Sequence, residues 1–94
     1  MDLNDVVIPD VVTTPEKKSL YDLLNENERI IVEYLRYPHN LGHFYHSLVD
    51  AIFYADTDNQ KRIEKAFPEL FEAYKTWRSG ELRERLESRG IYIL

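Results

Sequence analysis

The 94-residue sequence contains no cysteine, and this absence excludes several kinds of chemistry. Without thiols the chain has no disulfide framework, no thiolate metal site and no cysteine nucleophile. Glycine is also scarce, because Gly42, Gly80 and Gly90 are the only three and stand far apart. A phosphate-binding loop requires clustered glycines, so we expect no phosphate cradle and no bound organic cofactor.

An excess of positive charge is missing as well. The formal net charge is −5, with 12 lysines and arginines against 17 acidic residues. Between Glu81 and Arg89 the two signs alternate, which is typical of a solvated helix with paired charges four residues apart. A nucleic-acid-binding protein needs a clustered basic surface, so we expect no direct contact with nucleic acid.

No long hydrophobic run occurs in the sequence. The apolar stretches are too short for a membrane span, and the first residues lack the basic-then-apolar pattern of a signal peptide. We therefore expect a cytoplasmic protein that makes no contact with a membrane.

Hydrophobic and aromatic residues are plentiful. A hydrophobic fraction of 44% and a charged fraction of 31% are ordinary for a globular protein with one core. Aromatic residues make up 13% of the chain, and tyrosine and tryptophan serve interfaces as readily as cores. This surplus favours self-association or the binding of a partner.

Apolar residues recur at helical spacing and predict an all-α fold, a small bundle of three main helices plus a short C-terminal helix. The first helix is expected from Pro15 to about Arg36, with a break at residues 25–28 as the alternative. The second is expected from about Asn40 to Ala55. The third follows residues 56–59 and ends at 79–80, with a kink or restart at Phe67 before Pro68. The fourth covers 81–88, and the short connections predict antiparallel neighbours.

Both ends of the chain are expected to be extended. Residues 1–14 form a valine-rich N-terminal arm interrupted by Pro9, residues 15–94 form a single helical domain, and 91–94 form an apolar tail. Either end packs on its own domain or on another subunit. The predicted core consists of Leu24, Ile31, Leu35, Phe44, Leu48, Ile52, Ile63, Phe67, Leu70 and Tyr74.

The three histidines lie within eight residues, and Asp50 continues their spacing. His39, His43, His46 and Asp50 follow one another at steps of four, three and four, which places them on one stripe of a helix. Imidazole and carboxylate groups bind divalent metals, so the stripe is a candidate metal-binding or pH-responsive site. A straight helix spreads these four along about 16 Å, so at most two or three of them can share one ion. The other interpretation is an ordinary polar helix face.

A set of aromatic residues is the candidate interface. Tyr45, Phe53 and Tyr54 fall outside or at the margin of the apolar arc of the second helix, and Tyr37 lies just before it. Exposed together, they would form a binding surface. Alternatively, they are core residues of a middle helix that packs on two sides.

These patterns favour a non-enzymatic interaction module that acts as a homodimer or docks a protein partner. No catalytic residues are assigned, because Ser47 and His46 are adjacent on a helix and do not face each other. The alternatives are the divalent metal site described above, or an acidic decoy that inhibits a basic nucleic-acid-binding protein.

Overall fold

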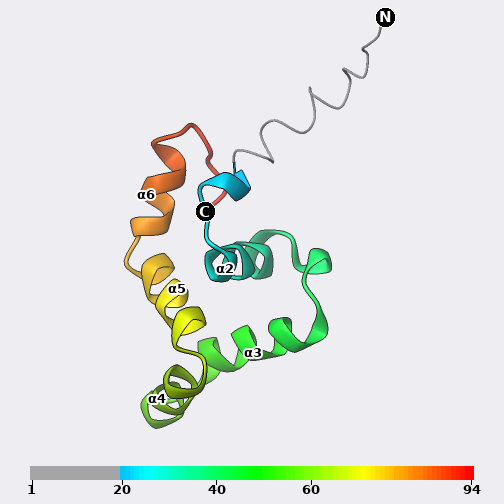
Figure 1. Cartoon of the computed structure of the whole chain (residues 1–94), viewed down its shortest axis with the longest axis vertical. Coiled ribbons are helices and arrows are strands. Elements are labelled where there is room, and N and C mark those ends of the chain that lie inside the picture. The colour runs from blue at the N-terminus through cyan, green and yellow to red at the C-terminus, as the bar shows by residue number, and fades with distance from the viewer. Residues whose placement is uncertain (1–19) are drawn as a thin grey trace, which may run out of the picture.

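The computed structural model describes residues 20–94, which are helices and their connections (Figure 1). Residues 20–22 are helical, and no strand occurs among the residues described. The prediction of an all-α fold is therefore confirmed, while the N-terminal arm and the start of the first predicted helix lie outside the described residues. The elements that follow are α2 (Glu26–Arg36), the 3₁₀ helix η1 (Pro38–Asn40), α3 (His43–Tyr54), α4 (Thr57–Ala66), α5 (Pro68–Arg78) and α6 (Glu81–Glu87).

The prediction of one continuous helix from Pro15 to Arg36 is wrong, and the alternative of a break is confirmed. Asn25 stops the preceding turn and caps α2. Its side chain accepts a hydrogen bond from the Glu28 N–H at 2.8 Å, and the Glu28 carboxylate accepts one from the Asn25 N–H at 3.0 Å. This capping box satisfies two backbone donors and gives α2 a start of its own.

The remaining helix boundaries follow local signals. Pro38 ends α2 and opens η1, so α3 starts at His43, three residues later than predicted. The Asp56 side chain caps α4 by accepting from the Asn59 N–H at 2.8 Å. Phe67 separates α4 from α5, which confirms the predicted restart before Pro68.

The helices are short, and Figure 1 shows α3 lying across the view and α4 nearly end-on, whereas α6 follows α5 along one side of the molecule. Ala55 and Asp56 have extended backbones and turn the chain between α3 and α4. The predicted bundle of antiparallel neighbours is therefore not confirmed. None of the helices within residues 20–94 is long and apolar enough to cross a membrane.

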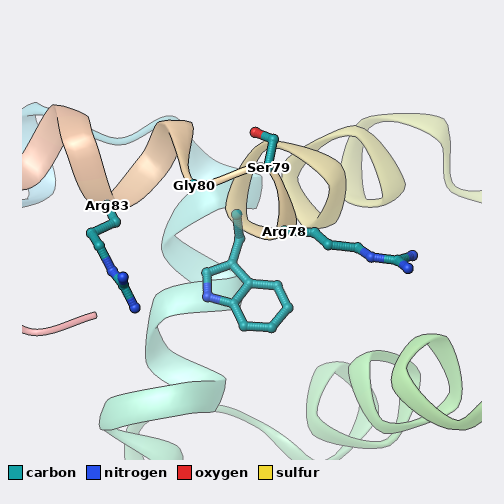
Figure 2. A pocket seen from close by; sticks show the side chains of 5 residues that line it. Arg78, Ser79, Gly80 and Arg83 are labelled. Carbon is teal, nitrogen blue, oxygen red and sulfur yellow. The ribbon is translucent and has the colours of Figure 1, made fainter.

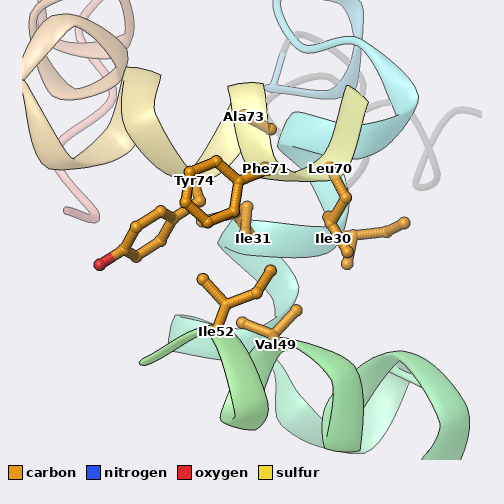
Figure 3. Packing of buried hydrophobic residues seen from close by; sticks show 8 residues of the cluster. All are labelled: Ile30, Ile31, Val49, Ile52, Leu70, Phe71, Ala73 and Tyr74. Atoms are coloured by element: carbon orange, nitrogen blue, oxygen red, sulfur yellow. The ribbon is translucent and has the colours of Figure 1, made fainter. Parts of the chain in front are cut away.

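The larger core cluster lies where α2, α3 and α5 meet (Figure 3). Ile31 and Ile52 are fully buried there, and Leu70 and Tyr74 pack against them as predicted. Phe44 and Phe67 were expected in this core, but both are exposed: Phe44 lies in the first turn of α3, and Phe67 is the capping residue between α4 and α5. The cluster consists of Ile30, Ile31, Val49, Ile52, Leu70, Phe71, Ala73 and Tyr74.

A second cluster closes the molecule beside α6. Leu20, Leu86 and Ile91 are buried together, so the C-terminal tail packs on its own chain. The Arg36 Nε also donates to the backbone oxygen of Ile93, which ties the tail to the end of α2. We call this region the closed end.

A partly buried ion pair between Arg85 of α6 and Glu28 connects the closed end to the start of α2. Arg85 donates to both carboxylate oxygens of Glu28, at 2.6 and 3.1 Å, and to the Leu23 carbonyl at 3.0 Å. Glu28 is buried, and burial by itself raises the pKa of a carboxyl group. The Arg85 hydrogen bonds, the Asn25 N–H and the Arg85 charge outweigh burial, so the pKa of Glu28 lies below its usual value.

Candidate functional site

The histidine stripe is divided between two elements. His39 lies in η1, whereas His43, His46 and Asp50 lie on α3. Pro38 and the extended residues Leu41 and Gly42 interrupt the helix, so His39 does not continue the α3 stripe.

His46 and Asp50 are the members of the stripe that the structure brings together. The His46 Nδ1 lies 3.8 Å from the Asp50 Oδ2, and each side chain is 43% exposed. Within residues 20–94 no group of three or more histidine and acidic side chains is placed to hold a metal ion. Metal binding by the His39, His43, His46 and Asp50 set stays a prediction, and its geometric support is this one pair.

Asp50 has a structural partner that the sequence did not reveal. The Tyr34 hydroxyl of α2 donates to Asp50 Oδ1, and the Tyr34 ring lies 5.1 Å from the His46 ring. Burial, the hydrogen bond to Asp50 and the negative charge of Asp50 raise the pKa of Tyr34 to about 12. The hydroxyl therefore stays protonated at neutral pH and links α2 to α3.

Two of the four predicted interface residues, Phe53 and Tyr37, are partly buried and pack against the core clusters. Phe53 is partly buried and stacks on Trp77, with ring centroids 5.1 Å apart and planes at 21°. It also meets Tyr34 and Tyr74 at 5.2 and 5.4 Å. Tyr37 packs against the second core cluster. Both therefore follow the core interpretation that the sequence left open.

The other two, Tyr45 and Tyr54, lie on the surface at opposite ends of α3. Tyr54 is 85% exposed in the last turn, whereas Tyr45 is 42% exposed in the first turn. Their positions differ by nine residues, which corresponds to a rise of about 13 Å along the helix. The two tyrosines therefore do not belong to one compact surface.

Tyr45 belongs to a group of three exposed aromatic residues, which we call the aromatic patch. Phe44 is 61% exposed and Phe67 is 37% exposed. The Phe44 ring lies 5.2 Å from that of Tyr45 and 6.2 Å from that of Phe67, both edge-on. The patch was not predicted, because the two phenylalanines were expected in the core. Phe44 lies in the first turn of α3, and Phe67 directly precedes Pro68, so both lie at helix ends.

A shallow pocket of about 280 Å³ adjoins the patch. Tyr45 and Phe67 form one side, and Ile30 and Leu70, which lie at one edge of the core in Figure 3, form an apolar part of its lining. The remaining lining residues are Glu26, Asn27, Ala66 and Glu69.

A neighbouring hollow extends this pocket along α2 and α5. It shares Glu26, Asn27 and Glu69 with the pocket and continues to Pro68 and Glu72. We call the two hollows together the acidic groove, because three carboxylates line it and no basic residue does.

Another pocket, of about 240 Å³, lies at the turn between α5 and α6. Trp77, Ser79 and Gly80 line it together with Arg78 and Arg83 (Figure 2). Figure 2 shows the two arginine side chains pointing in different directions on either side of the indole ring. Because their guanidinium groups do not converge, they do not form a site for a single anion.

No protein-family model, curated protein or solved structure matches the chain. Inferences about function therefore depend on the side-chain geometry of residues 20–94.

Proposed function

We propose that this chain is a non-enzymatic interaction module that docks a protein partner on the aromatic patch. The observation that carries the proposal is the contact between three exposed aromatic rings, Phe44, Tyr45 and Phe67. Single exposed apolar side chains are normal on soluble proteins, but adjoining aromatic rings form a continuous apolar surface. Covering that surface removes apolar area from water, which favours a complex and offsets part of the entropy that association costs.

The pocket beside the patch supports the same proposal. Aromatic residues are enriched among those that contribute most to protein–protein binding, and they act best next to a pocket that a partner side chain fills. Ile30 and Leu70 form part of its lining, and both belong to the core cluster where α2, α3 and α5 meet.

The proposal is tested with two matched serine substitutions on α3. Phe44→Ser removes the most exposed ring of the patch, and Tyr54→Ser removes an exposed ring at the other end of the same helix. The protein carrying each substitution is compared with the native chain for self-association by light scattering across concentrations, and for capture of partners from the native cell.

The proposal predicts that Phe44→Ser abolishes the association that the native chain shows, whereas Tyr54→Ser retains it. Circular dichroism should show unchanged helicity in both variants. Association that survives Phe44→Ser, or that both substitutions weaken equally, would contradict docking on the patch.

Metal binding is the second candidate function, and the 3.8 Å approach of His46 to Asp50 supports it. A histidine and a carboxylate four residues apart on a helix can both bind one divalent ion. Titration with nickel by calorimetry should give a binding signal that His46→Ala removes and that His39→Ala leaves unchanged. Binding no tighter than that of any exposed histidine, or insensitive to His46→Ala, would reject this function.

A further inference from the structure

The acidic groove combines apolar and acidic side chains in its lining. Tyr45 and Phe67 line only the hollow at the patch, Glu72 lines only the other hollow, and Glu26 and Glu69 line both. A segment lying in the groove therefore meets aromatic side chains and carboxylates side by side.

The carboxylates of the groove differ in how they are neutralised within the chain. Glu72 lies 3.4 Å from the Lys75 Nζ, so its charge is partly compensated. Neither Glu26 nor Glu69 forms an ion pair with another residue of the range 20–94. Both line the two hollows, so a cation bound in the groove lies near two carboxylates that form no ion pair within residues 20–94.

We propose, building on the docking function above, that the groove selects a partner segment in which an apolar anchor residue is flanked by lysine or arginine. The anchor fills the pocket between Tyr45 and Phe67. The flanking cation lies beside Glu26 and Glu69 at the rim. Apolar contact supplies affinity, and the charges supply the choice of partner.

A second copy of this chain is a poorer occupant of the groove. A symmetric dimer formed through this surface presents the same patch and the same carboxylates from both copies. The net charge of −5 adds to that repulsion. Charge complementarity therefore favours a different, basic protein segment over self-association.

The experiment is a selection from a displayed library of random peptides about a dozen residues long, with the full chain immobilised. Four proteins are compared: the native chain, Phe44→Ser, the double variant Glu26→Gln/Glu69→Gln, and the control Glu84→Gln/Glu87→Gln. The control removes two negative charges from α6, outside the groove. Individual peptides are then measured by fluorescence anisotropy at low and high salt.

The native chain should enrich peptides with lysine or arginine next to a large apolar residue, and Phe44→Ser should lose them. Glu26→Gln/Glu69→Gln should weaken the basic peptides by roughly two- to fivefold for each carboxylate removed, with no loss in the control. Salt at about 1 M should remove that difference by screening.

Two further outcomes distinguish a failure of this inference from a failure of the proposed docking function. Enrichment that depends on Phe44 but shows no preference for basic residues overturns the inference and leaves docking intact. No enrichment, or enrichment that Phe44→Ser leaves unchanged, overturns both.

Discussion

The two ends of this molecule use similar residues in opposite ways. At the closed end Leu86 and Ile91 are buried, because the C-terminal tail packs against α6 and Leu20. At the aromatic patch Phe44 and Phe67 are exposed, and no segment within residues 20–94 covers them. The closed end therefore contributes to the stability of the fold, whereas the patch leaves apolar surface in contact with solvent.

The first turn of α2 shows the same contrast over two residues. Glu26 and Glu28 differ by about 200° around the helix axis, so their side chains point to different sides. Glu28 is buried and paired with Arg85, whereas Glu26 lines the acidic groove. One helical turn thus supplies a carboxylate to the ion pair with Arg85 and another carboxylate to the lining of the groove.

Truncating an apolar side chain at each end gives the largest expected difference. Leu86→Ala creates a cavity around a fully buried side chain and should lower the free energy of unfolding by about 3 kcal/mol. Phe44→Ala should change it by less than about 0.5 kcal/mol, because Phe44 is mostly exposed. Urea unfolding followed by circular dichroism measures both, and equal effects would refute the contrast between the ends.

Removing one partner of the buried ion pair should have the next largest effect. Arg85→Gln leaves the Glu28 carboxylate buried without its cation and should lower the free energy of unfolding by about 2 kcal/mol. The expected loss is smaller than for a fully buried pair, because Arg85 is partly exposed. Adding Glu28→Gln should recover part of that loss. A double variant whose loss equals the sum of the two single losses would show that the pair is not coupled.

Acid should weaken the closed end through the same pair. The folded-state pKa of Glu28 lies below its ordinary value of 4.5, so its stabilising contribution is complete above about pH 4.5. The contribution is lost as the pH falls from there through the folded-state pKa. Urea midpoints measured across this range should fall more steeply for the native chain than for Glu28→Gln; identical slopes would remove Glu28 from the acid response.

The smallest expected effect concerns the hydrogen bond between α2 and α3. The pKa of Tyr34 is raised to about 12, so the hydrogen bond from its hydroxyl to Asp50 stabilises the fold fully below pH 10. This stabilisation is lost as the pH rises from 10 to 12. In an ultraviolet titration of the seven tyrosines, Tyr34→Phe should remove the latest phase, and Asp50→Asn should shift it to lower pH. At neutral pH Tyr34→Phe should lower the free energy of unfolding by only about 1 kcal/mol. A late phase that persists in Tyr34→Phe would assign it to another tyrosine.

Sequence periodicity predicted the helices well and their ends less well. The all-α class, the restart at Phe67 and the short helix at 81–87 follow from local spacing and proline chemistry. The single helix through residues 23–25 failed because the apolar phase survives across a break that the Asn25–Glu28 capping box imposes. The spacing of the apolar residues by itself therefore does not indicate the break at Asn25.

The candidate site was harder to predict than the fold. Phe44 satisfies the apolar arc of α3, but burial depends on whether α2 or α5 extends far enough to cover it, and that is a tertiary property. The Glu28–Arg85 pair joins residues 57 positions apart, so no local pattern indicates it. Tyr45 departs from that arc, and the structure places it on the surface in the patch; its role as an interface residue stays a prediction.

The backbone of Phe67 has a consequence for how a partner would bind. Its N–H donates to the Ile63 carbonyl at 2.8 Å, and its carbonyl accepts from the Phe71 N–H at 3.0 Å. This residue thus ends one helix and begins the next, with both of its backbone polar groups occupied. The chain at this point is preorganised, so docking loses little backbone entropy there. The conformational-entropy cost of binding at this point would therefore fall on the incoming segment rather than on the backbone of Phe67.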